Sequence, residues 1–369
     1  MTIKLLVADD SALMRRHLKD LFEQAGGFEV RTVRNGAEAL AELDRLDPDV
    51  ITLDINMPEM DGLTCLSRIM VQRPKPVVMV SSLTAEGAEA TLQSLSLGAV
   101  DFVRKPDGTI SLSIDRISAE LRAKVRAAVG ARVRSTTGLR GRLENERSRI
   151  VARAGRGVGA IPGLVAGRPG LVLIGVSTGG PSTLEEILPR LPSGFPWAVL
   201  VAQHMPGGFT GVFARRLNEL CALRVVEAAQ QMPIEPGTVY IAKGDADLLV
   251  LRRGTGFVAA PVPASADHLW HPSVTRLVQS AMDVVPLDRL IGVQLTGMGD
   301  DGAELRRRGG RTFAQDAASS VVFGMPGELI RRGGASAVVR SDRIAGQLVA
   351  WLLPQETARP EAPHATRAR

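Results

Sequence analysis

Cysteine is scarce in this sequence, and long apolar runs are missing. The chain of 369 residues has only Cys65 and Cys221, which are too few and too far apart for a disulfide framework or a zinc site. No apolar run reaches the roughly 18 residues of a membrane-spanning helix, and no charged leader precedes an apolar segment at the start of the chain. We therefore expect a protein of the reducing cytoplasm that is neither secreted nor membrane-embedded.

The sequence does have enough apolar residues for substantial cores. Hydrophobic residues make up 45% and charged residues 23%, as in a soluble globular protein. A length prior of about 100–200 residues per domain predicts two domains. The formal charge is +6, and arginine is dense over residues 116–168, a basic stretch of the kind that attracts nucleic acid or acidic protein surfaces.

Strand and helix signals alternate through the first third of the chain, which predicts a doubly wound α/β domain with a parallel sheet. An Arg- and Gly-rich stretch then has the composition of a linker, and the alternation resumes with buried strands at residues 171–176, 198–203 and 291–296. Shorter strands are expected at residues 239–242, 248–252 and 256–259, the last two as a hairpin. The predicted division is a (βα)5 domain at 1–125, a linker at 126–169, a second α/β domain with a mostly parallel, doubly wound sheet at 170–354 and a disordered tail at 355–369.

Polar side chains follow four of the predicted strands of the first domain. Asp9 and Asp10 follow the first strand, Asp54 the third, Ser81 the fourth and Lys105 the fifth. Ligands of open parallel sheets bind outside the carboxyl ends of the strands, so we expect these side chains to meet at one edge. Each alone could be a helix cap, a turn residue or a surface charge, but their joint placement favours a site.

Three carboxylates repel one another unless a cation neutralises them, and hard oxygen ligands suit Mg²⁺. A carboxylate beside Mg²⁺ can attack a phosphoryl donor and become an acyl phosphate. Asp54 is central enough for that role. The expected site has Asp54 as phosphoryl acceptor, Asp9, Asp10, Asp54 and the Asn56 backbone carbonyl around Mg²⁺, and Ser81 and Lys105 on the phosphoryl oxygens.

The motifs VADDS, LDINMPEMDG, VMVSSLT and DFVRKP together resemble a bacterial response-regulator receiver domain over nearly all of residues 1–125. The resemblance implies a histidine kinase as phosphodonor and Mg²⁺ as cofactor. It also places Phe102 where that family has an aromatic switch residue.

A serine lies at the turn after the first strand of the second domain, in LVLIGVSTGGPSTL. Gly175 to Gly179 fit the G-x-S-x-G pattern of a nucleophile elbow around Ser177. The same residues fit a glycine-rich anion cradle at a helix start, or a plain helix cap. The pattern alone leaves these three interpretations open.

A serine nucleophile needs a base, and one histidine is placed to supply it. His204 directly follows a predicted buried strand, which puts it on the same sheet edge as Ser177. A third strand ends at Asp300 and Asp301, either of which could orient the imidazole. An α/β-hydrolase has the order Ser, Asp, His, so the order Ser, His, Asp argues against that fold. The other histidines, which fall in the first domain, the tail or an irregular stretch, are His17, His268, His271 and His364.

The motifs IGVSTGG, QHMPGGFTGVFARRLN, PGTVYIA, LTGMGDDGA and AQDAASSVVFGMP resemble, over residues 170–350, the catalytic domain of the bacterial chemotaxis protein-glutamate methylesterases. The resemblance implies Ser177 as nucleophile, His204 as base and Asp301 as orienting acid. It further implies that the backbone N–H groups of Thr178 and Met298 bind the oxyanion.

The activity so implied is hydrolysis of glutamate methyl esters, and deamidation of certain glutamines, on the cytoplasmic helices of chemoreceptors. The chemistry is acyl transfer through a glutamyl-seryl intermediate, with no metal in this domain. The resemblance also implies that the unphosphorylated first domain covers the active site and that phosphorylation of Asp54 uncovers it.

The chain departs from the family pattern at the edge of the expected substrate cleft. Lys243, Asp247 and residues 269–275 differ, and the segment after Asp301 is shorter by about one helical turn. The target could therefore be another signalling protein in a parallel chemosensory pathway, or the domain could be a catalytically silent scaffold. The basic linker suggests a DNA-binding regulator, but the second domain has no clear helix-turn-helix pattern, and we expect no nucleic-acid partner.

Overall fold

The computed structural model describes residues 2–81, 84–105, 110–133, 169–298 and 303–352. Most of the expected linker, the tail, and both Asp300 and Asp301 lie outside these residues. No helix of the described ranges has the length and apolar character needed to cross a membrane.

The N-terminal domain has the predicted parallel sheet with helices on both faces. Its five strands lie in the order β2-β1-β3-β4-β5, and every neighbouring pair is parallel. Asp54 and Ser81 are the last residues of their strands. The elements are β1 (Ile3–Ala8), α1 (Ala12–Gln24), β2 (Phe28–Val33), α2 (Gly36–Leu46), β3 (Val50–Asp54), α3 (Gly62–Gln72), β4 (Val77–Ser81), α4 (Ala85–Leu97), β5 (Asp101–Arg104) and α5 (Ile110–Val129).

Helix caps and a two-sided core define this domain. The N-cap side chains of Ser11, Asn35, Asp61 and Thr84 each accept a hydrogen bond from a backbone N–H of the first turn, which satisfies a donor that the helix cannot. Apolar residues of α1 and α5 cover one face of the sheet, and those of α2, α3 and α4 cover the other. The central strands are apolar almost throughout because both faces are covered.

The C-terminal domain is built on a seven-stranded sheet in the order β15-β14-β13-β6-β7-β10-β8, in which every neighbouring pair is parallel. The predicted α/β class is confirmed, whereas β8, β14 and β15 are strands that the sequence patterns did not indicate. The elements of this sheet and its helices are β6 (Leu171–Val176), α7 (Gly180–Ile187), β7 (Ala198–Gln203), α8 (Phe209–Leu220), β8 (Arg224–Ala228), β10 (Thr238–Ala242), α9 (Val274–Val284), β13 (Leu290–Gln294), α10 (Ala303–Arg307), β14 (Arg311–Gln315), α11 (Met325–Arg331), β15 (Ala337–Val339) and α12 (Ser341–Leu352).

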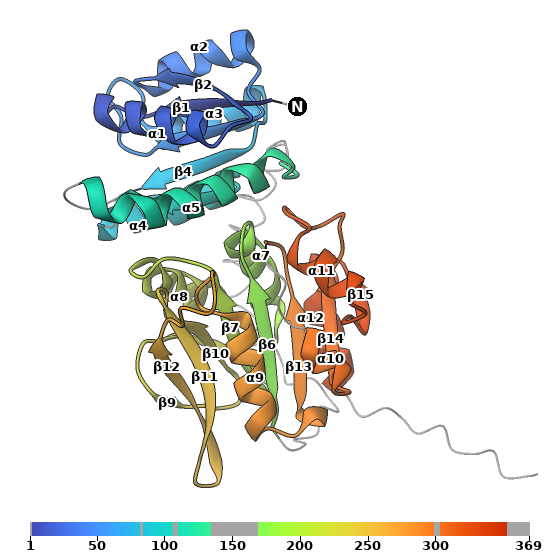
Figure 1. Cartoon of the computed structure of the whole chain (residues 1–369). Helices are drawn as coiled ribbons and strands as arrows, with labels where there is room; N and C mark the ends of the chain where they lie inside the picture. The colour runs from blue at the N-terminus through green and yellow to red at the C-terminus, as the bar shows by residue number, and fades with distance from the viewer. Residues whose placement is uncertain (1, 82–83, 106–109, 134–168, 299–302, 353–369) are drawn as a thin grey trace, which may run out of the picture.

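A small antiparallel sheet packs beside α9 (Figure 1). It contains β11 (Ala246–Arg253), β12 (Gly256–Pro263) and β9 (Met232–Pro233). The predicted hairpin is confirmed, and Gly254 at its turn has a positive φ of 58° that favours glycine.

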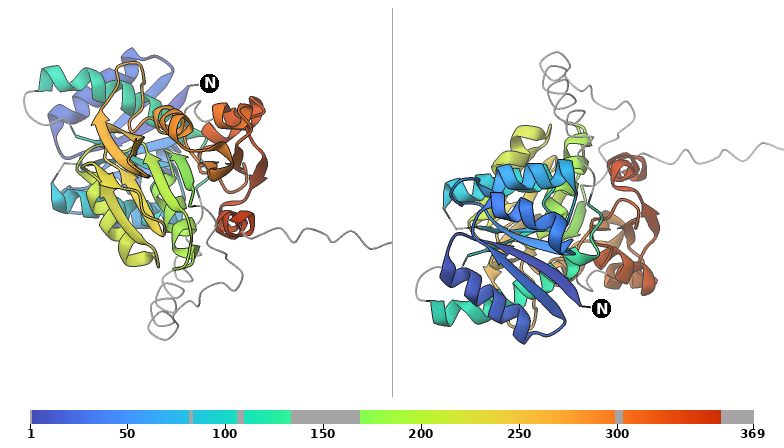
Figure 2. Two further views of the ribbon diagram at one scale, coloured as in Figure 1. Left: turned by 90° about the horizontal axis from the view of Figure 1, so that it is seen from below. Right: turned by 90° about the horizontal axis from the view of Figure 1, so that it is seen from above.

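The two domains are stacked along the vertical axis of Figure 1, and they overlap in the views from below and above in Figure 2. The N-terminal domain lies over the carboxyl ends of β6 and β7. Backbone contact is direct, because Gly179 N–H donates to the Val100 carbonyl over 3.2 Å. The ring centroids of Phe102 and Phe209 lie 4.6 Å apart across the same boundary. The two domains therefore contact each other through both polar and apolar groups.

A close backbone approach in the N-terminal domain gives the first prediction. A Cβ atom on Gly62 would lie 2.1 Å from the carbonyl oxygen of Asp54, a backbone atom that cannot move freely. We expect Gly62→Ala to lower the free energy of unfolding by about 1–3 kcal/mol, measured as an earlier transition in thermal or urea unfolding.

The matched control is Gly346→Ala in the middle of α12, where an added Cβ meets no atom within 4 Å. Alanine there should stabilise the helix by about 0.5–1 kcal/mol. If the two variants had equal stability, the close backbone approach at Gly62 would not contribute to the free energy of unfolding.

Candidate active site

Ser177 lies in the turn between β6 and α7, at the carboxyl edge of the sheet. Its backbone N–H donates to the Thr296 carbonyl over 2.9 Å, which joins it to the chain leaving β13. Gly297 then passes so close that an added Cβ would lie 2.4 Å from Ser177 Cβ. The serine is only 3% exposed. Because the backbone approaches it closely on two sides, its position is restricted.

His204 follows β7 directly and lies beside Ser177. The last register pair of the two strands is Val176 with Gln203, so Ser177 and His204 are the next residues along each strand. The His204 backbone N–H donates to the Val176 carbonyl over 3.0 Å, which extends the pairing by one residue. The structure thus brings the predicted nucleophile and base to adjacent strand ends.

The third predicted member of the triad, Asp301, lies outside the described residues, and its role stays a prediction. Among the described residues, neither Nδ1 nor Nε2 of His204 has a hydrogen-bond partner. Gln203, which the sequence analysis missed, donates from Nε2 to the Ser177 carbonyl over 3.0 Å. Its polar side chain at the end of an otherwise apolar strand is the signal that could have identified it.

Burial keeps the His204 imidazole neutral. It lowers the pKa of His204 to about 3, and the positive charges of Lys124 and His271 add to this effect while Asp247 opposes it. An unfolded histidine takes up a proton near pH 6.5. The contribution of His204 to folding stability is therefore present above that pH and is lost as the pH falls towards the folded value.

The N-terminal domain contacts the turn that carries Ser177. Thr178 Oγ1 donates to Asp101 Oδ2 over 2.5 Å, and both groups are buried. Asp101 also pairs with Lys124 over 3.3 Å, and Lys124 Nζ donates to the Phe102 carbonyl over 2.8 Å. Burial works against the ammonium form of Lys124, but the carboxylates of Asp101 and Glu120 outweigh it and raise its pKa. A buried cation is thereby held just above the candidate site.

The predicted carboxylate cluster is assembled in the N-terminal domain. One oxygen each of Asp9, Asp10 and Asp54 lie within 4.8 Å of one another. Lys105 Nζ lies 2.6 Å from Asp54 Oδ2 and 3.1 Å from Asp9 Oδ2. Burial raises the pKa of Asp54 to about 6, and the charge of Asp9 adds to this although Lys105 opposes it.

These residues fit a divalent cation. Three converging carboxylates face one ammonium group, so negative charge is in excess where oxygen ligands meet, and Mg²⁺ favours such ligands. The backbone N–H of Asn56 hydrogen-bonds Asp54; its carbonyl as a ligand stays a prediction.

Ser81 and Phe102 both contact helices. Ser81 Oγ accepts a hydrogen bond from Thr91 Oγ1 over 2.7 Å and donates to the Gly87 carbonyl, both on α4. Phe102 is 2% exposed and packs on Phe209 of α8. The predicted switch residue is thus an interdomain contact, which the sequence did not indicate.

Two of the positions that depart from the expected family pattern differ in how far they are buried. Lys243 is exposed, whereas Asp247 is fully buried and hydrogen-bonded to His271, Ser273, Ser265 and Arg276. Trp270, in the same irregular stretch, lies against the His204 ring. The departures at residues 269–275 were the signal that could have identified Trp270 as part of the site.

Known proteins share both domains of this chain. Residues 172–348 match the CheB methylesterase family, and residues 5–113 match the response regulator receiver domain. A Rhodospirillum rubrum protein named protein-glutamate methylesterase/protein-glutamine glutaminase 3 is 64% identical over 355 residues, which are 95% of this chain and 96% of that protein. The chain belongs to the CheB methylesterase family.

Other members of the CheB methylesterase family are also similar. A Rhodopseudomonas palustris protein named protein-glutamate methylesterase/protein-glutamine glutaminase 2 is 51% identical over 359 residues, 95% of this chain and 98% of its own length. The crystal structure of the Thermotoga maritima CheB methylesterase catalytic domain is 36% identical, covers 50% of this chain and 99% of that one, and has a TM-score of 0.48. The resemblance predicted from the motifs is confirmed.

One of the interdomain hydrogen bonds of this CheB methylesterase, from Thr178 to Asp101, gives the second prediction. Thr178→Val removes the hydroxyl but keeps the side-chain shape, so the buried Asp101 carboxylate loses a donor. Losing a hydrogen bond to a charged group costs about 1.5–3 kcal/mol. We expect about 10- to 100-fold faster amide hydrogen exchange in β5 and at the end of α4, where Ser96 contacts the second domain, as the domains separate more often.

Thr183→Val is the matched control, because Thr183 Oγ1 bonds only to the Gly179 carbonyl within its own helix turn. Exchange in β5 should be unchanged in this variant. Equal exchange rates in the two variants would show that the Thr178–Asp101 bond does not hold the domains together.

Proposed function

We propose that this chain is a protein-glutamate methylesterase and protein-glutamine glutaminase of chemotaxis that is activated by phosphorylation. The main support is the placement of Ser177 and His204 at adjacent strand ends, directly beneath the receiver domain. The names of full-length relatives give the same two activities. The substrates are glutamate methyl esters and glutamines on the cytoplasmic helices of chemoreceptors.

The chemistry is acyl transfer. His204 takes the proton of Ser177 Oγ, and the oxygen attacks the carbonyl carbon of the ester. The imidazolium then returns the proton to the leaving methoxide, which departs as methanol, or to the leaving amine of a glutamine, which departs as ammonia. Water, deprotonated by His204, attacks the glutamyl-seryl ester. The imidazolium then returns the proton to Ser177 Oγ as the ester bond breaks, which releases glutamate and restores the serine. Asp301 orients the imidazole in this scheme.

The oxyanion is bound by backbone N–H groups of Thr178 and Met298. Within the described ranges, neither N–H donates to another residue, so both are available to a ligand. A neutral His204 agrees with the role of base, since the imidazole must accept a proton before it can return one.

The receiver domain controls access to this site. A histidine kinase is the phosphodonor and Asp54 is the acceptor. Asp9, Asp10 and Asp54 would hold Mg²⁺, which would supply positive charge beside the phosphoryl group. Lys105 and Ser81 contact the phosphoryl oxygens. Because the Ser81 hydroxyl is bonded to α4, and α4 packs on the second domain, a new partner for Ser81 disturbs the interdomain contact.

A different target protein in a parallel chemosensory pathway is the second candidate. Trp270 and exposed Lys243 and Leu269 lie where the family pattern changes. Such changes alter which receptor helix fits, while the acyl-transfer chemistry stays the same.

Ser177→Ala tests the nucleophile. If serine, histidine and aspartate act as a unit, the turnover number should fall by about 10⁴–10⁶. The measurement is methanol release from methylated receptor by phosphodonor-treated protein. Ser182→Ala, the same substitution in the following helix turn, should keep wild-type turnover; comparable rates in both variants would exclude Ser177 as nucleophile.

Asp54→Asn tests the switch. The amide cannot form an acyl phosphate, so a small-molecule phosphodonor should no longer raise methanol release, while the basal rate remains. Asp44→Asn, an exposed carboxylate paired with Arg73, serves as the control and should respond like the wild type. Full activation of Asp54→Asn would place the switch elsewhere.

A further inference from the structure

The indole of Trp270 lies beside the imidazole of His204. Their ring centroids are 5.9 Å apart and the ring planes differ by 14°, a near-parallel, offset arrangement. His204 itself is 5% exposed, and neither of its ring nitrogens has a hydrogen-bond partner among the described residues. The stacked indole is thus a described contact that restricts the plane of the imidazole.

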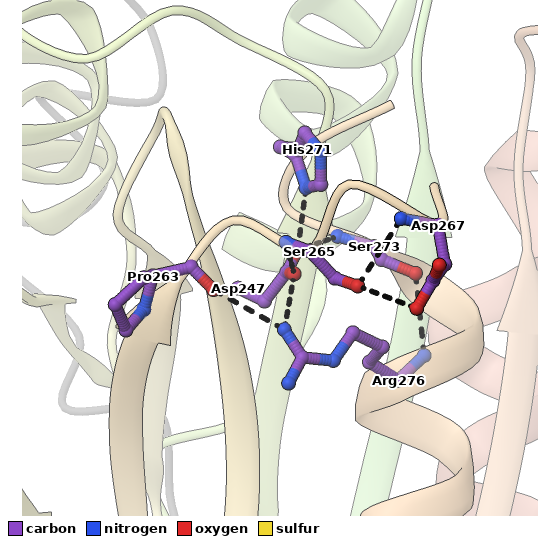
Figure 3. A network of polar contacts seen from close by, with 7 residues as sticks. All are labelled: Asp247, Pro263, Ser265, Asp267, His271, Ser273 and Arg276. Carbon is purple, nitrogen blue, oxygen red and sulfur yellow. Dashed lines mark hydrogen bonds and ion pairs between the residues drawn. The ribbon is translucent and has the colours of Figure 1, made fainter. Parts of the chain in front are cut away.

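The segment that carries Trp270 is attached to one buried carboxylate. Asp247 at the start of β11 is only 1% exposed. Its carboxylate accepts a hydrogen bond from His271 Nδ1 over 2.8 Å and another from Arg276 Nη1 over 2.6 Å (Figure 3). It also accepts from the backbone N–H groups of Ser273 over 2.6 Å and Ser265 over 3.1 Å. These donors lie on both sides of Trp270 in the chain, so one side chain holds both ends of the segment.

The network also ties Trp270 to the strand that leads to Ser177. Ser273 caps α9, whose first residue, Val274, packs against the end of β6: a Cβ on Gly175 would lie 2.6 Å from Val274 Cγ1. Burial of Asp247 opposes its ionisation, but hydrogen bonds, from His271 first, outweigh this and lower its pKa. The carboxylate is therefore ionised at neutral pH and accepts from all of its donors.

We propose that Trp270 is a positioning residue for the base, and that Asp247 acts on catalysis through it by holding residues 265–273 so that the indole stays against the His204 ring. This proposal rests on the proposed function, because it takes His204 as the base. The effect is on the orientation of the imidazole towards Ser177 Oγ, and a small misorientation in an active site can cost about 100-fold in rate.

The experiment measures kcat and KM for methanol release from methylated receptor, using the full chain treated with phosphodonor. Trp270→Ala should lower kcat by about 10- to 100-fold with little change in KM. Trp270→Phe keeps an aromatic face and should restore kcat to within about threefold of the wild type. A residue that only bound substrate would raise KM instead.

Asp247→Asn tests whether the carboxylate acts through the indole. It should lower kcat as Trp270→Ala does, and the double variant should lose no more than the Trp270→Ala variant alone. If thermal unfolding shows that Asp247→Asn does not fold, Arg276→Gln, which removes one donor and leaves the carboxylate with the others, takes its place.

Trp351→Ala is the matched control, because Trp351 stacks on Phe313 with centroids 3.8 Å apart at another place in the same domain. It should lower stability and leave kcat unchanged. An unchanged kcat in Trp270→Ala, or losses that multiply in the double variant, would overturn the proposal. With Ser177→Ala inactive, such a result overturns the positioning role alone; with Ser177→Ala active, the proposed function and this inference both fail.

Discussion

The pairing of β6 with its two parallel neighbours determines most of what this protein can do. The backbone bonds from His204 to Val176 and from Ser177 to Thr296 continue the sheet register one residue past the strand ends. Since helices cover both faces of the sheet, the strands are apolar throughout, and a shift of register would expose or misplace every following side chain. The hydroxyl and the imidazole are therefore held together by the most buried part of the fold.

The same sheet edge is also the surface on which the receiver domain docks, so the candidate active site and the domain contact occupy the same surface. At this surface the buried Lys124 ammonium pairs with Asp101, and the Asp101 carboxylate accepts a hydrogen bond from the Thr178 hydroxyl. The Lys124 ammonium also adds a positive charge near His204, which favours the neutral imidazole. The buried ion pair itself contributes little net stability, because desolvation offsets most of its Coulomb attraction.

Asp247 shows how a family site can change around a constant reaction centre. Among the described residues its carboxylate does not hydrogen-bond Ser177, yet it orders the segment whose indole stacks beside the His204 ring. Four donors satisfy a fully buried charge, which makes the segment rigid as well as stable. The chain thereby combines rigid strand ends that carry Ser177 and His204 with an anchored irregular segment that contacts the His204 ring.

The sequence was enough to predict both α/β domains and the positions of Ser177, His204, Asp9, Asp54 and Lys105, because each follows an apolar run and the ends of parallel strands meet at one edge. Asp301 stays a prediction that lies outside the described residues. The contact of Thr178 with Asp101, 77 residues away, and the packing of Phe102 between the domains emerge only from the three-dimensional fold. The same is true of the stacking of Trp270 on His204 and of the hydrogen bonds by which Asp247 anchors that segment. These contacts join irregular segments and separate domains, where no hydrophobic period records which side chains meet, so packing alone settles them.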